Sequence, residues 1–176
     1  MWVVGKVQTS PNVILTTCMV DSREDVNQDF CYAFNEVIAR IKDNKDSLGF
    51  LQTASDPVST FKFFMNNLGR PEWPYSVVLY YEDTKDWPVG VLLFSKGSPW
   101  YSDALVYNEE CSVAFKRGLG LATANYLTLK YLMPKKADLI QLSCANPPCA
   151  KMLENTYSRL GMNHYKTFYE DLTTTN

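Results

Sequence analysis

The sequence predicts an α/β (α+β) protein with a mixed, mostly antiparallel sheet of about six or seven strands, flanked by helices. Three observations predict this class. The middle of the chain holds β-rich runs separated by short turns, as in an antiparallel meander. Two segments with apolar residues at steps of three and four precede the meander, which predicts amphipathic helices. A strand–helix–strand unit follows it, which predicts a crossover connection in the same sheet.

The N-terminal part is expected to form a hairpin and then two helices. The strands of the hairpin are expected at residues 2–7 and 13–20. Asp21 or Ser22 is a suitable N-cap for the first helix. The second helix has Pro57 at its first position and Gly69 just past its end, which are the usual places for these residues.

The remaining elements follow from the same patterns. Strands are expected at residues 76–81, 88–95, 102–113, 139–143 and 162–169, and helices at residues 119–133 and 148–160. The helix at residues 119–133 is apolar nearly all round, so it is expected to be buried. Residues 1–172 are expected to form one domain, and residues 173–176 a frayed tail.

Composition and charge restrict the class of protein. The chain has 176 residues, of which 46% are hydrophobic and 20% are charged, which is typical of a globular domain. The formal net charge of −2 argues against nucleic acid or an anionic membrane as a partner. No apolar run approaches the roughly 18 residues of a membrane span, and no signal peptide is recognisable.

The cysteines indicate reduced thiols and no metal site. There are five cysteines, no CxxC spacing, and a single histidine, His164, so a Cys/His zinc site is poorly supported. Reduced thiols fit a cytoplasmic protein, and the alternative is a disulfide between Cys144 and Cys149 across the Pro147-Pro148 turn.

The stretch from Val113 to Ala122 is the one that indicates chemistry. A predicted strand enters a turn with two glycines, Gly118 and Gly120, and a predicted helix begins there. The first N–H groups of a helix lack partners and its dipole adds positive potential. Glycines let an anion approach the backbone. The stretch therefore predicts an anion site, although neither GxxxxGK[ST] nor GxGxxG is present.

This stretch resembles the acetyl-CoA signature of the GNAT superfamily of acyl-CoA N-acyltransferases, Arg-x-x-Gly-x-Ala, through Arg117, Gly120 and Ala122. The resemblance implies that the loop and the helix start hold the pyrophosphate of coenzyme A. It also implies that a splayed pair of strands, at residues 102–113 and 139–143, admits the cofactor. The implied cofactor-binding residues are Ser112, Val113, Ala114, Arg117, Gly118, Leu119, Gly120, Leu121, Ala122 and Asn146.

A second resemblance lies downstream. Residues 139–146 look like the next strand of the family, which ends in an asparagine, here Asn146. Tyr157, Leu160 and Gly161 look like its Tyr-x-x-Leu-Gly-Phe, with Met162 in place of phenylalanine. The segment between Asn146 and Tyr157 is longer than in the family and contains two prolines, so the alignment of Asn146 is less secure than that of Tyr157.

The resemblance implies direct acetyl transfer from acetyl-CoA to an amine. Tyr157 is expected to protonate the departing thiolate, since a phenol can stay protonated until charge develops on sulfur. Backbone N–H groups near residues 112–114 are expected to polarise the carbonyl oxygen. Glu109 or Glu110 is expected to take the proton of the amine, and only one of them can face the cleft because neighbours on a strand point to opposite faces.

Two other interpretations stay open at the level of the sequence. One is a GNAT-fold module that binds without catalysis, because no general base is evident. The other is an acyltransferase for a nucleobase or nucleic acid, against which the net charge argues. The sequence leaves the amine acceptor unidentified, and a homodimer is also left open.

Overall fold

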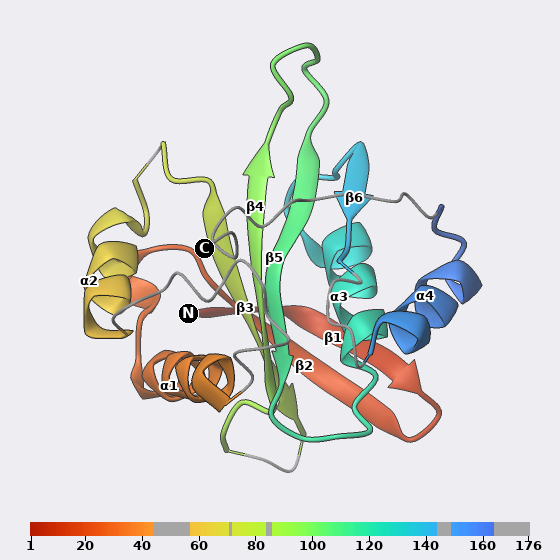
Figure 1. The fold of residues 1–176 in the computed structure, drawn as a ribbon, viewed down its shortest axis with the longest axis horizontal. Helices are drawn as coiled ribbons and strands as arrows, with labels where there is room; N and C mark the ends of the chain where they lie inside the picture. Colours follow the sequence, from red (N-terminus) through yellow and green to blue (C-terminus); the bar gives the residue numbers. More distant parts are fainter. Residues whose placement is uncertain (44–56, 71, 84–85, 144–148, 164–176) are drawn as a thin grey trace, which may run out of the picture.

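The computed structural model describes residues 1–43, 57–70, 72–83, 86–143 and 149–163. The described strands form one sheet whose spatial order follows the chain, β1-β2-β3-β4-β5-β6. All neighbours are antiparallel except β5 and β6, which are parallel (Figure 1). The strands are β1 (Trp2–Ser10), β2 (Val13–Val20), β3 (Tyr75–Glu82), β4 (Gly90–Gly97), β5 (Val106–Ala114) and β6 (Leu139–Gln141). The predicted mixed, mostly antiparallel sheet is confirmed.

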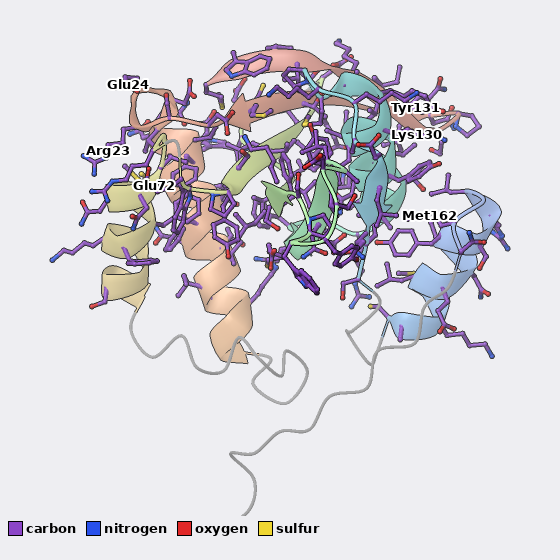
Figure 2. All side chains as sticks on the ribbon, turned by 90° about the horizontal axis from the view of Figure 1, so that it is seen from above. Arg23, Glu24, Glu72, Lys130, Tyr131 and Met162 are labelled. Atoms are coloured by element: carbon purple, nitrogen blue, oxygen red, sulfur yellow. The ribbon has the colours of Figure 1, made fainter. Side chains whose placement is uncertain are left out.

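Helices cover both faces of the sheet. They are η1 (Arg23–Asp25), α1 (Gln28–Asp43), α2 (Pro57–Asn67), α3 (Leu121–Leu127), its π-helical continuation η3 (Thr128–Leu132), and α4 (Ala150–Arg159). In Figures 1 and 2, α1 and α2 lie on one side of the sheet and α3 and α4 on the other. Figure 2 accordingly shows Met162, just past α4, across the molecule from Arg23 and Glu72.

The alternation of side chains along the strands builds two cores. In β3, Val77 and Leu79 point to α1 and α2, whereas Val78 and Tyr80 point to α3. Successive side chains of a strand point to opposite faces, and β3 is apolar on both because it is covered on both. Among the described helices, none is long and apolar enough to cross a bilayer.

The first helix begins later than the sequence predicts. Ser22 and Asp21 precede a short 3₁₀ turn, and the carboxylate of Asp25 accepts the N–H of each at 3.1 Å. The α-helix starts at Gln28, and the side chain of Asn27 accepts the N–H of Phe30 at 3.0 Å. The predicted N-cap at Asp21 or Ser22 is therefore wrong for α1, and Asn27 takes that role.

Three other elements begin a few residues later than the sequence predicts. The strand expected at residues 102–113 begins at Val106, because the β4–β5 hairpin extends through Trp100 and Tyr101. The helix expected at residues 119–133 begins at Leu121, since Gly120 has a left-handed φ of 66°. The helix expected from residue 148 begins at Ala150. The strand predicted at residues 162–169 lies largely outside the described residues.

Candidate functional site

The parallel pair of β5 and β6 separates soon after it begins. Val106, Tyr107 and Asn108 pair with Leu139, Ile140 and Gln141, and β6 ends there. Strand β5 continues to Ala114, paired only with β4 on its other edge among the described residues. Backbone N–H and C=O groups on that edge of β5 are therefore available to a ligand. This divergence agrees with the splayed pair of strands implied by the sequence.

A β-bulge interrupts β5 at the point of divergence. The pairing of β4 with β5 steps from Phe94 opposite Glu109 to Leu93 opposite Cys111, so Glu110 is the extra residue. A bulge re-aims side chains and bends the strand, and bulges are common beside active sites. Here the extra residue is itself one of the two candidate carboxylates, and the other, Glu109, directly precedes it.

Glu110 lies on the face of the sheet that carries α1 and α2. Its Oε1 accepts hydrogen bonds from Ser95 Oγ at 2.6 Å and from Asn108 Nδ2 at 3.1 Å. These two bonds fix the direction of the carboxylate. None of the ion pairs of the described residues includes Glu110. Its charge is thus held in place and not neutralised by a neighbouring cation.

Glu109 points the other way, toward α3. Its Oε2 is closed off from solvent and has no hydrogen-bond partner in the structure. Burial raises the pKa of Glu109 to about 7, partly offset by the amide of Asn125. Three more buried polar atoms lie on the same side: Tyr80 Oη, Asn125 Oδ1 and Thr128 Oγ1. We refer to Tyr80, Glu109, Asn125 and Thr128 as the buried polar cluster.

Side chains of the cluster connect to the candidate cofactor strand. Asn125 Nδ2 donates to Ser112 Oγ at 2.7 Å. Helix α3 therefore fixes the side chain of Ser112, one of the predicted cofactor-binding residues of β5. Burial of the Tyr80 hydroxyl raises its pKa, and the nearby charge of Glu109 adds to that rise. The cluster is therefore most favourable when Glu109 keeps its proton, because a protonated carboxyl can donate a hydrogen bond.

The glycine loop is anchored to β1. Thr9 Oγ1 donates to the carbonyl oxygen of Leu119 at 2.7 Å, and the side chain of Leu119 is buried. Gly118 and Gly120 both have left-handed φ values, 82° and 66°. A Cβ at Gly118 would meet nothing within 4 Å, whereas one at Gly120 would lie 3.0 Å from the Thr9 Cβ. The open side of the loop is therefore at Gly118.

The start of α3 offers its backbone to an anion. Ala124 N–H donates to Gly120 O at 3.0 Å, so the N–H groups of residues 121–123 precede the first helical hydrogen bond. Arg117 is exposed, and no ion pair of the described residues includes it. Lys116, by contrast, pairs with Glu82 at 2.9 Å. An arginine beside a free helix start suits a phosphate.

The other predicted cofactor residues divide by burial. Leu119 and Leu121 pack in the core beneath α3, so only their backbone can serve a ligand. Val113 packs partly against the core under α1 and α2, while Ala114 and Ala122 are exposed and half-buried respectively. Asn146 lies outside the described residues.

Tyr157 lies on the buried side of α4. Its side chain is only 6% exposed, and α4 lies beside α3. The N–H groups of Leu160 and Met162 both donate to the Tyr157 carbonyl, which ends the helix at the predicted Leu-Gly. The structure therefore places Tyr157 on the α3 side of the sheet.

The sequence patterns do not predict three side chains that bond candidate site residues. Ser95 and Asn108 orient Glu110 across strands, and no local pattern shows a contact that depends on sheet register. Asn125 was detectable in part, because it is a polar residue within a helix that is otherwise apolar. Such a residue signals a buried hydrogen-bond network.

These features together define the GNAT fold: a mostly antiparallel sheet, a diverging parallel pair, and a glycine loop that opens the helix between them. Solved structures of acetyltransferases share the fold. An aminoglycoside acetyltransferase, meta-AAC0020, from an uncultured soil metagenomic sample matches with a TM-score of 0.59, 14% identity, and coverage of 90% of this chain and 96% of that chain. It was solved in complex with sisomicin.

Two further structures match over similar lengths. The ribosomal-protein-alanine N-acetyltransferase from Brucella melitensis biovar Abortus 2308 gives a TM-score of 0.55 and 11% identity, covering 89% of this chain and 97% of that one. A predicted acetyltransferase with acetyl-CoA from Clostridium acetobutylicum gives 0.55 and 12%, covering 89% and 94%. No protein-family model matches the sequence, and no curated protein matches it significantly.

Proposed function

We propose that this protein is an acetyl-CoA-dependent N-acetyltransferase that transfers an acetyl group to an amine. The observation that carries the proposal is the divergence of β5 from β6 directly before the glycine loop. Among the described residues, the edge of β5 that faces away from β4 has no partner strand between Glu110 and Ala114. A ligand that lies along this edge reaches the glycine loop at one end and a fixed carboxylate at the other.

The residues present fit coenzyme A. The backbone from Gly118 to the first turn of α3 supplies N–H groups for the pyrophosphate, and Gly118 leaves room for it. Arg117 adds a cation that is available for a phosphate. Backbone groups of Ser112 to Ala114 are suited to hydrogen-bond the pantetheine arm and the acyl carbonyl. Bound acetyl-CoA supplies an activated thioester for acyl transfer.

Glu110 is the better candidate for the base. It is the extra residue of the β5 bulge, and its carboxylate is held by Ser95 and Asn108. Its carboxylate would accept the proton of the acceptor ammonium, directly or through water, so that a neutral amine attacks the acyl carbon. Glu109 points into the buried polar cluster and is a less suitable base. Tyr157 would return a proton to the thiolate.

The acceptor does not follow from the fold. One structure with this fold is an aminoglycoside acetyltransferase and another acetylates a ribosomal-protein alanine, so the fold suits acceptors of different sizes. The proposal includes a cytosolic location, which rests on the scattered cysteines of the sequence.

The test is cofactor binding followed by turnover. Native mass spectrometry and calorimetry should detect coenzyme A bound at a 1:1 ratio, and an acetyl-donor assay against an amine library should detect transfer. Arg117→Glu should weaken coenzyme A binding by about tenfold or more, because it replaces the phosphate contact with a repulsion. Arg159→Glu, at the exposed end of α4, is the matched control and should bind normally.

The outcomes separate the interpretations. A protein that binds neither coenzyme A nor acetyl-CoA would contradict the proposal. Binding that depends on Arg117 but yields no transfer to any amine would favour a module that binds without catalysis.

A further inference from the structure

A groove of about 420 Å³ lies where β5 and β6 are still paired. Its walls come from the start of β3, the β4–β5 hairpin and the paired ends of β5 and β6. Its lining includes Tyr75, Ser95, Lys96, Tyr101, Asn108 and Gln141. Its volume falls in the range of small-molecule sites, about 300–1,000 Å³.

Sheet register places the floor of the groove on one face. Tyr75 pairs with Ser95, Ser95 with Asn108, and Asn108 with Gln141. Paired residues in neighbouring strands point to the same face, so these four side chains form a row across four strands. It is the face that carries α1 and α2, because Val77 and Leu79, which alternate with Tyr75, pack in that core.

The floor of the groove is hydrogen-bonded to Glu110. Two of the floor residues, Ser95 and Asn108, donate the hydrogen bonds that hold the Glu110 carboxylate. Asn108 and Gln141 are also the last pair before β5 and β6 separate. The candidate base therefore lies directly beside the floor of the groove, next to the point where the two strands separate.

Charge near the groove favours a cation. Lys96 is the one charged residue of the lining, and it is neutralised by Asp21 at 3.0 Å. Glu110 has no cationic partner among the described residues. The carboxylate of Glu110, hydrogen-bonded to two floor residues, is thus the uncompensated charge beside the groove, and it attracts an ammonium group.

The rest of the lining is neutral, polar and aromatic. Gln141 is exposed, and its amide can both donate and accept. Tyr75 belongs to the floor, and Tyr101, 73% exposed, comes from the β4–β5 hairpin. Aromatic faces suit the apolar faces of a saturated ring, while amides and hydroxyls suit its hydroxyl groups.

We propose that this groove is the acceptor subsite, and that it takes an amine-bearing sugar with its ammonium at Glu110. The role of the sugar as an acetyl acceptor rests on the proposed function. Binding of the sugar does not, and it is tested without any cofactor. The ring lies between Tyr101 and the floor, and its amine reaches the free edge of β5.

The probe is the β1,4-linked disaccharide of glucosamine, with cellobiose as the matched sugar in which hydroxyls replace the amines. Calorimetry, at a pH where the amines are protonated, should show that the glucosamine disaccharide binds and that cellobiose binds at least about tenfold more weakly. Failure of the glucosamine disaccharide to bind, or equal binding of both sugars, would overturn the proposal.

Two pairs of variants locate the site. Gln141→Lys adds a cation to the floor of the groove, opposite Asn108, and should weaken binding of the glucosamine disaccharide by about tenfold, whereas Gln141→Glu, of similar size, should not weaken it. Tyr101→Ala should weaken it too, whereas Tyr131→Ala, at a side chain 66% exposed and outside the lining, should not. Binding that ignores Gln141→Lys and Tyr101→Ala would place the sugar elsewhere and refute the subsite.

The two proposals can fail separately. If coenzyme A binds and a different amine is acetylated while the groove variants have no effect, the subsite is wrong and the proposed function stands. If the disaccharide binds in the groove but coenzyme A does not bind, the subsite stands as a sugar site and the proposed function is wrong.

Discussion

Glu109 and Glu110 are neighbours in the chain with opposite surroundings. Glu110 is held at the bulge of β5 by Ser95, and Glu109 is buried toward α3 with Oε2 unpaired. The pKa of Glu109 is about 7 in the folded protein, against an ordinary value of 4.5. The folded state therefore binds the proton more tightly than the unfolded state. Its contribution to stability is fully present below about pH 4.5 and is lost as the pH rises through about 7.

Glu109→Gln tests this directly. The amide is neutral at every pH, so the fall in the free energy of unfolding between pH 5 and 8 should shrink by about 2–3 kcal/mol at most. Urea unfolding across this pH range measures it. Glu72→Gln, at an exposed carboxylate, is the control and should leave the pH dependence of the parent protein intact. If the free energy of unfolding of Glu109→Gln fell as steeply with pH as that of the parent protein, ionisation of Glu109 would not destabilise the fold.

Two roles are open for Tyr157: a core side chain and the general acid. Its side chain is 6% exposed, as expected for a core tyrosine, yet its position three residues before Leu160-Gly161 matches the proposed general acid. Tyr157→Phe keeps the ring and removes only the hydroxyl. With an acceptor in hand, kcat should fall by about 10²-fold or more while coenzyme A affinity is kept. Tyr126→Phe on α3 is the control and should leave kcat unchanged. Unchanged kcat in Tyr157→Phe would leave a purely structural role.

At the scale of elements, the sequence predicted what depends on local pattern. The strand periodicity and the glycine loop were enough to predict the fold class and the start of α3 within two residues. The bulge at Glu110 was not predictable, because it exists only relative to the pairing of β4 with β5. The groove likewise depends on four strands in register. The N-cap of α1 was wrong because Ser22 satisfies a separate 3₁₀ turn that propensity does not distinguish from a helix start.

The two glycines of the loop have different tasks, and this changes how the loop should be tested. Gly120 was expected to line the anion site, but its Cβ position faces Thr9 at 3.0 Å. Gly120→Ala should therefore destabilise the fold by about 2 kcal/mol, through a left-handed φ and a close contact. Gly118→Ala, whose Cβ would meet open space, should cost only about 1 kcal/mol. Thermal unfolding compares them, and equal losses would contradict the assignment.

For the whole molecule, the free edge of β5 predicts a measurable response to cofactor. Amides of residues 110–114 that point away from β4 should exchange quickly in the unliganded protein, and their exchange should slow on addition of coenzyme A. At a ligand concentration 100 times Kd, the protein should also gain about 2.7 kcal/mol of stability. Amides of β2, which is paired on both sides, are the internal control. Protection in β2 alone would mean that coenzyme A binds away from β5.

The short junction between β5 and β6 has a consequence for how the protein unfolds. Strands β1 to β5 form a continuous antiparallel unit in which each pair of neighbouring strands shares at least six residue pairs, whereas β6 joins β5 through three. A segment held by few pairings opens locally at a lower free energy than the rest of its sheet. Strand β6 should therefore detach first from the sheet under mild denaturant. Its release would open the groove that Leu139 and Gln141 line before the rest of the sheet unfolds.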